Sequence, residues 1–301
     1  MLHFLRGVLM GTADTIPGIS GGTVAVLTGI YERLVTAISH ADGQTVAMVL
    51  KGQFRDAFKR VDGGFLCELL LGVVAGIACS TTLVLYLLEN HLPVTFAAFA
   101  GLILGSVWIL FHALKGKGVG AYVSLVLGAC AAWGIVSLNT LAGSPNPGYV
   151  FVCGVVAICA MILPGISGSY ILLLLGEYAF IIEKVKNVIH LQTNVSELTT
   201  LAIFAAGCVI GLIAFSKFLK WMLTYFHQTT VSVLCGFMLG SLKCLWPMQV
   251  MVTRAGKKAF EPLPVEMITN TLWCHVGIAA AAGLVLILVL HRLARSRASR
   301  S

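Results

Sequence analysis

One six-residue pattern occurs twice in the chain, 147 positions apart, and its residue types are those that bind anions. The first copy is Pro17-Gly18-Ile19-Ser20-Gly21-Gly22 and the second is Pro164-Gly165-Ile166-Ser167-Gly168-Ser169. A helix that restarts after such a break presents unpaired backbone N–H groups and the positive end of its dipole. The glycines let the backbone approach a ligand, and the hydroxyls add hydrogen-bond donors. We therefore expect an anion-binding site, with phosphate the best match in size and acceptor count.

Residues of both copies are expected to contact the anion. They are Pro17, Gly18, Ser20, Gly21, Gly22 and Thr23 in the first copy, and Pro164, Gly165, Ser167, Gly168 and Ser169 in the second. A simpler explanation is that the serines only cap helices and the glycines only allow close packing. That explanation would suffice for a single copy, but two copies at matching positions favour a bound ligand. These residues form the predicted substrate-binding set, and no catalytic residue is assigned.

Ionisable residues lie within or beside the apolar stretches that surround the two copies. They are Arg6, Asp14, Glu32, Arg33 and Glu177. Ionisable groups inside a membrane are costly, so they are functional candidates by default. We expect Asp14 and Glu177 to lie deepest, where either could carry a coupled proton or pair with Arg6 or Arg33. Glu32 and Arg33 fit equally well at a helix end in the membrane interface.

The composition indicates what kind of protein positions these residues. Of 301 residues, 58% are hydrophobic and only 11% are charged, whereas soluble domains carry about 25% charged residues. The sequence therefore predicts an all-α polytopic membrane protein. Stretches long enough to cross a bilayer, about 20 residues, cover roughly 65–89, 94–114, 119–141, 198–226, 229–247 and 272–291. Each motif copy interrupts a further apolar stretch, so its freed backbone groups must be buried in protein or line a cavity.

The duplication extends beyond the motif and divides one membrane domain into two repeats, residues 1–147 and 148–301. At an offset of 135, the segment 101–106 matches 236–241. At the same offset two GxxxG pairs match, Gly72 and Gly76 with Gly207 and Gly211. Such pairs are typical of helices that pack closely in membranes. A common origin of the two halves explains these matches better than chance.

The number of spans bears on how the two halves are oriented. If the breaks at 17–22 and 164–169 are re-entrant, each half has three full spans, an odd number, and the second half is inverted as in many transporters. A broken helix that still crosses the membrane is the alternative. Four arginines, at positions 292, 295, 297 and 300, follow the last span closely. Because basic clusters favour the cytoplasm, we prefer the inverted arrangement, with both termini cytoplasmic.

Residues 41–64 form a sizeable insert between apolar stretches. Four apolar side chains recur there at helical spacing beside three basic ones: Leu50, Phe54, Phe58 and Val61, with Lys51, Arg55 and Lys59. This pattern predicts an amphipathic helix in the cytoplasmic interface near anionic lipid, although a solvated loop helix explains it equally well. The stretch 248–271 is expected to be a plain extramembrane loop.

Other partners and cofactors find little support in the sequence. The net charge of +8 comes from basic residues scattered around apolar spans, so topology and lipid headgroups explain it better than nucleic acid. The nine cysteines form no CxxC pair, and the eight histidines form no HxxxH or HExxH pattern. We therefore expect no metal, disulfide or cofactor. The oligomeric state is open, and a homo-oligomer is compatible with the sequence.

The motif and its flanks resemble the opening of a bacterial membrane family. The segment Gly11-x-x-Asp14-x-Ile16-Pro17-Gly18-Ile19-Ser20-Gly21-Gly22-Thr23, followed by Thr28-Gly29-Ile30-Tyr31-Glu32-Arg33, is similar to that of the polyprenyl-phosphate (undecaprenyl-phosphate) translocases, and the resemblance covers essentially the whole chain. It implies a protein of the bacterial cytoplasmic membrane that flips undecaprenyl phosphate and so recycles the lipid carrier of peptidoglycan and surface-glycan synthesis. The headgroup would sit between the two motifs while the apolar tail stays in lipid.

Two other functions are alternatives to the flipping of undecaprenyl phosphate. Undecaprenyl-diphosphate phosphatases are similar in their repeats and carry a Pro-Gly-x-Ser motif followed by arginine, but Gly21 and Gly168 stand at that place here. Without the arginine the charge that would stabilise a phosphoryl transition state is missing, so we do not expect an enzyme. A small-anion transporter for phosphate or chloride is the second alternative, because glycine- and serine-rich helix ends bind such ions equally well.

Overall fold

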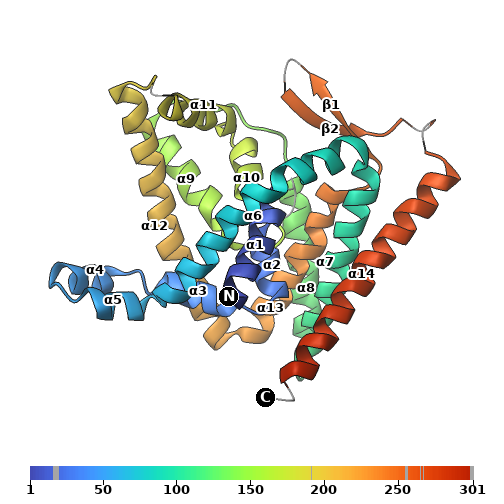
Figure 1. The fold of residues 1–301 in the computed structure, drawn as a ribbon, viewed down its shortest axis with the longest axis horizontal. Helices are drawn as coiled ribbons and strands as arrows, with labels where there is room; N and C mark the ends of the chain where they lie inside the picture. Colours follow the sequence, from blue (N-terminus) through green and yellow to red (C-terminus); the bar gives the residue numbers. More distant parts are fainter. Residues whose placement is uncertain (16–19, 191, 255–256, 265, 267, 299–301) are drawn as a thin grey trace. The chain divides into compact units, whose positions relative to one another are not determined.

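The computed structural model describes residues 1–15, 20–190, 192–254, 257–264, 266 and 268–298 (Figure 1). In the first half the helices are α1 (Leu2–Asp14), α2 (Gly21–Leu27), α3 (Tyr31–Ser39), α4 (Gly43–Leu50), α5 (Phe54–Arg60), α6 (Gly63–Asn90), α7 (Leu92–Ala113) and α8 (Val119–Val136). In the second half they are α9 (Pro147–Ile162), α10 (Gly168–Leu174), α11 (Tyr178–Ile189), α12 (Val195–Tyr225), α13 (His227–Ser241), η1 (Leu242–Leu245) and α14 (Asn270–Ala298), with strands β1 (Gln249–Arg254) and β2 (Lys257–Pro262).

Six of these helices are long and apolar enough to cross a membrane. The qualifying segments are Gly63–Ser80, Leu92–Ala113, Val119–Val136, Val195–Tyr225, His227–Leu245 and Asn270–Val289. They correspond to the six apolar stretches of the sequence, which confirms a multi-pass all-α membrane protein. The helix before the second motif copy, α9, is shorter, and at 1.5 Å per residue it spans only about 24 Å.

The chain separates into two compact units, and each unit takes pieces from both halves of the sequence. Unit 1 comprises Met1–Ile77 and Ser137–Thr230, and unit 2 comprises Ala78–Val136 and Val231–Ser301. Both motif copies belong to unit 1. There α2 packs against α1, and α10 packs against α9.

Helix packing in unit 1 depends on glycines at equivalent positions of the two halves. A Cβ at Gly72 in α6 would meet the carbonyl oxygen of Phe4 in α1, and a Cβ at Gly207 in α12 would meet that of Phe151 in α9. Phe4 and Phe151 are themselves 147 positions apart. The predicted close packing of the GxxxG helices is therefore confirmed, because only glycine lets these backbones touch.

The same rule governs unit 2, where each half packs on a helix of the other half. A Cβ at Gly101 in α7 would meet the carbonyl oxygen of Ala280 in α14, and a Cβ at Gly236 in α13 would meet that of Leu125 in α8. Gly101 matches Gly236 at offset 135, and Ala280 matches Leu125 at offset 155. Equivalent helices thus make equivalent contacts. The last helix of the first half, α8, packs on α13 of the second half, and the last helix of the second half, α14, packs on α7 of the first half.

The expectation of a plain loop at 248–271 is wrong. Strands β1 and β2 pair antiparallel there, with Gln249 opposite Pro262 and Arg254 opposite Lys257. The β-branched residues Val250, Val252 and Thr253 favour an extended backbone. Pro262 ends β2, a position where a missing N–H costs little. At the base of this hairpin Met248 is buried against Ala97 and Val276.

Candidate substrate-binding site

The first motif copy begins a helix whose N-terminus is fully satisfied from within the protein. Pro17 and Gly18 lie outside the described residues. Ser20 is the N-cap of α2, with an extended backbone (φ −115°, ψ 137°), and its Oγ accepts the N–H of Gly22 at 3.1 Å. The hydroxyl of Ser20 is therefore used as a cap, as the simpler explanation of the motif requires.

A carboxylate occupies the place at which an anion is expected. Asp14, the last residue of α1, accepts the backbone N–H of Gly21 through Oδ1 at 2.6 Å. A Cβ at Gly21 would lie 2.6 Å from Oδ2 of the same carboxylate. Gly21 is thus required for the approach of Asp14, and the carboxylate complements the positive end of the short α2 helix.

The second motif copy differs from the first because it has no such carboxylate. Met161 stands at the position equivalent to Asp14. Ser167 is the N-cap of α10 but makes no capping hydrogen bond. Its hydroxyl instead lies 2.7 Å from that of Ser169, and Ser169 is exposed whereas Ser20 and Thr23 are buried. The second copy is therefore the more open of the two.

The two copies adjoin each other in unit 1. Gly165 donates its backbone N–H to Oγ1 of Thr23 at 2.9 Å, a buried hydrogen bond between residues 142 positions apart. The hydroxyl of Tyr31 donates to the carbonyl oxygen of Ile162 at 3.1 Å. A longer contact of 3.4 Å joins Ser20 Oγ to the carbonyl oxygen of Met161. These contacts hold the start of α2 against the end of α9.

Each motif helix stops after two turns at an equivalent glycine, which the sequence analysis did not foresee. Gly29 and Gly176 have φ values of +70° and +76°. Ile30 N–H donates to the carbonyl oxygen of Ala25, and Glu177 N–H donates to that of Leu172. These are the hydrogen bonds of a Schellman motif, in which glycine in the left-handed region ends a helix. The paired breaks position α3 and α11 separately from α2 and α10.

Glu177 is one of the few buried acidic residues. It follows Gly176, and only 2% of its surface is exposed. Its Oε1 accepts the backbone N–H of Ser144 at 2.7 Å, while Oε2 has no hydrogen-bond partner among the residues that the structure describes. The hydrogen-bond partner of Oε1 is thus Ser144 and not Arg6 or Arg33.

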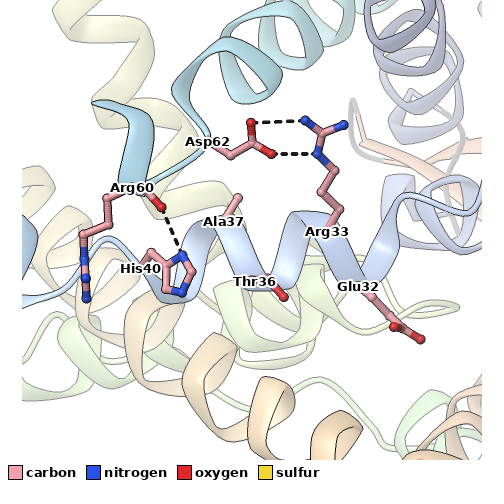
Figure 2. A pocket seen from close by; sticks show the side chains of 7 residues that line it. All are labelled: Glu32, Arg33, Thr36, Ala37, His40, Arg60 and Asp62. Carbon is pink, nitrogen blue, oxygen red and sulfur yellow. Dashed lines mark hydrogen bonds and ion pairs between the residues drawn. The ribbon is translucent and has the colours of Figure 1, made fainter. Parts of the chain in front are cut away.

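Arg33 pairs with neither Asp14 nor Glu177, in contrast to one of the alternatives above. Its Nε and Nη2 donate to the two carboxylate oxygens of Asp62 at 2.6 and 3.1 Å (Figure 2). This bidentate guanidinium holds the pKa of Asp62 below its usual value. Glu32, the residue before Arg33 in α3, lies 2.9 Å from Nε2 of His227. Arg33 and Glu32 thus each pair with a residue outside both motif copies.

A pocket of about 350 Å³ lies along this face of α3. It is lined by Glu32, Arg33, Thr36, Ala37, His40, Arg60 and Asp62 (Figure 2). Of this set, only Glu32 and Arg33 were predicted from the sequence as candidate functional residues. The others come from the last turn of α3 and from the end of α5, so their proximity depends on the fold of the insert.

Comparison with known proteins shows to which family the chain belongs. Residues 10–260 match the undecaprenyl phosphate translocase-like family. The chain belongs to this family. It is 38% identical over 262 residues to a polyprenyl-phosphate transporter of Vibrio cholerae, covering 87% of this chain and 82% of that protein. It is 31% identical over 259 residues to a polyprenyl-phosphate transporter of Staphylococcus aureus, covering 82% of this chain and 86% of that protein. No solved structure matches the chain.

Membership of this family makes the chain a transporter rather than an enzyme. This outcome agrees with the glycines at positions 21 and 168, where the phosphatases carry an arginine. The matched region includes both motif copies, all of the α3 pocket and the insert. The geometry around the two motifs can therefore be interpreted as that of a transporter.

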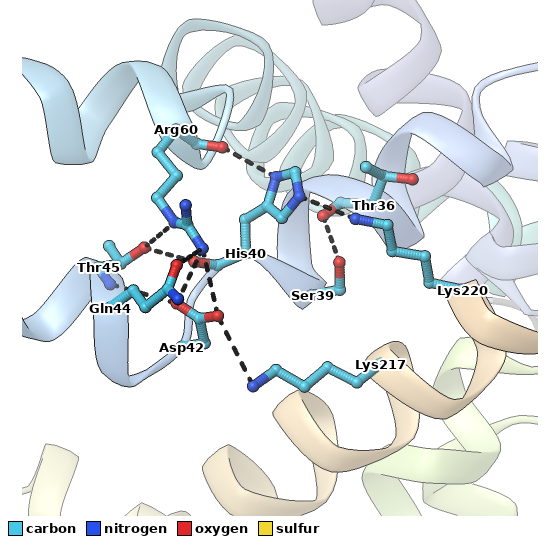
Figure 3. Close-up of polar contacts among 9 residues, drawn as sticks. All are labelled: Thr36, Ser39, His40, Asp42, Gln44, Thr45, Arg60, Lys217 and Lys220. Carbon is cyan, nitrogen blue, oxygen red and sulfur yellow. Dashed lines mark hydrogen bonds and ion pairs between the residues drawn. The ribbon is translucent and has the colours of Figure 1, made fainter.

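A polar cluster that the sequence did not predict joins the insert to α12. Lys220 Nζ lies 2.8 Å from Nε2 of His40, whose Nδ1 lies 3.0 Å from the carbonyl oxygen of Arg60 (Figure 3). Lys217 Nζ lies 3.8 Å from the Asp42 carboxylate. The hydrogen bond from the backbone N–H of Thr45 lowers the pKa of Asp42, and the positive charge of Arg60 lowers it further. Lys217 and Lys220 thus connect α12 to the start of the insert.

Proposed function

We propose that this protein transports polyprenyl phosphate by moving the phosphate headgroup through the membrane domain while the tail stays in lipid. The observation that supports this most directly is the pairing of the two motif copies, joined by the hydrogen bond from Gly165 to Thr23. Two relatives are named polyprenyl-phosphate transporters. In this proposal the flipped lipid is undecaprenyl phosphate, and its return recycles the carrier of cell-wall and surface-glycan synthesis.

The headgroup is proposed to bind between the two motifs. Gly168 and Ser169, with the hydroxyl of Ser167, offer donors that no carboxylate covers. At the first copy the N–H of Gly21 is held by Asp14, so a phosphate can use that donor only if it displaces the carboxylate. Two anions at this site repel strongly where water is scarce. Phosphate binding and a charged, hydrogen-bonded Asp14 therefore exclude one another.

This exclusion supplies a route for ion coupling. Protonation of Asp14 removes the repulsion and weakens its hold on Gly21, so phosphate and a proton would bind together. Glu177 is the second candidate for a coupled proton, because it is buried with one carboxylate oxygen unpartnered. Glu32, Arg33 and Arg6 have no such role in this proposal, and Arg33 and Glu32 instead stabilise the interfacial end of α3.

Alternating access is proposed to come from an inverted repeat. Equivalent glycines make equivalent contacts in the two halves, and each motif is followed by the same pair of helices. We place residues 1–147 and 148–301 in opposite orientations in the bacterial cytoplasmic membrane, with both termini in the cytoplasm. One motif copy would then face each side of the membrane.

The test is a transport assay in liposomes that contain polyprenyl phosphate. A membrane-impermeant phosphatase added outside reports the fraction of headgroups that become accessible with time. The proposal expects this fraction to rise beyond the outer leaflet only when the protein is present, with or without an imposed proton gradient. A parallel assay of inorganic phosphate uptake separates the small-anion alternative: uptake of phosphate without lipid movement would replace the proposal by that alternative.

A further inference from the structure

The helical hairpin of α4 and α5 carries an apolar surface that the described chain leaves uncovered. The two helices pack on each other and project beyond the end of α3 (Figure 1). The exposed fractions of the five large apolar side chains are 56% for Val46, 41% for Val49, 83% for Leu50, 66% for Phe54 and 52% for Phe58. Their spacing of three and four residues places them along one stripe of each helix. We call these five residues the hairpin surface.

Basic side chains follow the hairpin surface. Arg55 and Lys59 lie four residues apart in α5, beside Phe54 and Phe58, and Lys51 directly follows the last residue of α4. All three are exposed. Cations beside exposed aromatic side chains are the pattern of a helix that lies in a membrane interface. The positive charge of this pattern complements anionic lipid headgroups. Five exposed large apolar side chains in one patch are unusual for a helix surrounded by water and indicate a surface that contacts lipid or protein.

The covalent structure keeps the hairpin close to the bilayer. Helix α5 ends at Arg60 and the first membrane-crossing segment begins at Gly63, so only two residues separate them. The base of the hairpin is tied to α12, another crossing helix, by the contacts of Asp42 with Lys217 and of His40 with Lys220 (Figure 3). Two crossing helices thus hold the hairpin at the membrane surface.

We propose that the hairpin surface binds anionic phospholipid, with its apolar side chains at the boundary between headgroups and acyl chains and with Lys51, Arg55 and Lys59 contacting headgroup phosphates. This binding is separate from polyprenyl phosphate transport and does not require it. Each cation near such a surface contributes attraction equivalent to roughly a fivefold change in binding. These three cations should therefore make the insertion sensitive to lipid charge and to salt.

The experiment places a fluorescent amino acid at Phe54 of the full-length protein, reconstituted in vesicles with lipids brominated near the headgroup. Asp56 is the matched control site, because it lies two residues away on the opposite side of α5. Quenching at position 54 should be several-fold stronger than at position 56, and stronger with anionic than with zwitterionic lipid. In K51Q/R55Q/K59Q, half-maximal quenching should require a several-fold larger fraction of anionic lipid.

Each alternative gives a different result in the same vesicles. Equal, weak quenching at positions 54 and 56 would mean a solvated hairpin and would overturn the proposal. Weak quenching together with energy transfer between labels on different molecules would mean that a second copy of the chain covers the surface. Strong quenching that ignores lipid charge in both the parent and the K51Q/R55Q/K59Q protein would refute the role of the three cations. Transport of polyprenyl phosphate by each variant is measured separately, so a failure of one proposal does not affect the other.

Discussion

The carboxylate of Asp14 accepts the backbone N–H of Gly21 at 2.6 Å, and so the end of α1 binds the start of α2 across the first motif. Position 161, which is equivalent to Asp14 in the second half, is methionine. The two nearly identical motifs therefore differ in charge, because the first is bound by the carboxylate of Asp14 and the second has methionine at the equivalent position. We therefore expect the two copies to have different tasks in the proposed headgroup site.

Replacing Asp14 by asparagine tests whether its charge competes with phosphate. The amide keeps an acceptor for Gly21 but removes the repulsion, so polyprenyl phosphate should bind about tenfold more tightly at neutral pH. The parent protein should bind more tightly on acidification, and D14N should lose this effect. Calorimetry or native mass spectrometry in detergent measures both effects. Glu32→Gln, an exposed change beside His227, is the control, and weaker binding by D14N would contradict competition.

Replacing Gly21 and Gly168 by valine should block the proposed headgroup site. A Cβ at Gly21 would lie 2.6 Å from Asp14 Oδ2, and a Cβ at Gly168 would lie 2.6 Å from the carbonyl oxygen of Ala157. The double variant G21V/G168V is therefore expected to lose lipid binding. Gly43→Val is the matched control, since a Cβ there meets nothing within 4 Å. Binding that survives in a folded G21V/G168V protein would show that the headgroup binds elsewhere.

Thr23→Val tests the hydrogen bond that joins the two motifs. The change leaves the buried N–H of Gly165 without its acceptor, at a cost of about 1–2 kcal/mol in the free energy of unfolding. Thr23→Ser retains the hydroxyl and should retain most of that stability. Thermal unfolding in detergent measures the difference. Equal midpoints for T23V and T23S would mean that the contact contributes nothing.

The ion pair of Arg33 with Asp62 should make a small, pH-dependent contribution to stability. Because Arg33 lowers the pKa of Asp62 in the folded protein, the pair stabilises above the pKa of the unfolded state, near 4, and its contribution disappears as the pH falls through the lowered value. Both side chains are more than one-third exposed, so the effect should stay below about 1 kcal/mol. Asp62→Asn should lower the unfolding midpoint slightly at pH 7 and by less at pH 3. An equal shift of the unfolding midpoint at pH 7 and pH 3 would show that the charge of Asp62 does not contribute to stability.

The inverted orientation predicts on which side each connection lies. Gln44 in the insert and Thr193 before α12 occupy corresponding connections of the two halves, after α3 and after α11. Single cysteines introduced there, in a background without the native cysteines, should react with an impermeant reagent from opposite sides of the membrane. Labelling of both from one side would exclude the inversion.

The sequence allowed the crossing helices and their close contacts to be predicted because both depend on composition and short spacing. Apolar runs identified six crossing segments, and GxxxG pairs such as Gly72 with Gly76 identified the packed helices. Asp14 and Glu177 were recognised as unusual acids. Their hydrogen-bond partners could not be predicted, because capping by Asp14 depends on how the chain turns at the motif.

Contacts between distant residues account for most of what was missed. His40 and Lys220 are 180 positions apart, and nothing in either local sequence indicates the other. Gly29 and Gly176 carried a usable signal, since glycine shortly after an apolar run often ends a helix. The β-branched residues of β1 were a comparable signal for the hairpin at 249–262. We nevertheless expected a plain loop there.

The most direct test of the central claim is the accessibility of polyprenyl phosphate headgroups in liposomes carrying the parent protein, G21V/G168V or G43V. A membrane-impermeant phosphatase added outside should convert nearly all of the lipid with the parent and with G43V, but only the outer-leaflet fraction with G21V/G168V. Complete conversion by a folded G21V/G168V protein would show that the paired motifs do not carry the headgroup. Conversion limited to the outer leaflet with the parent, under proton and sodium gradients alike, would contradict transport of this lipid.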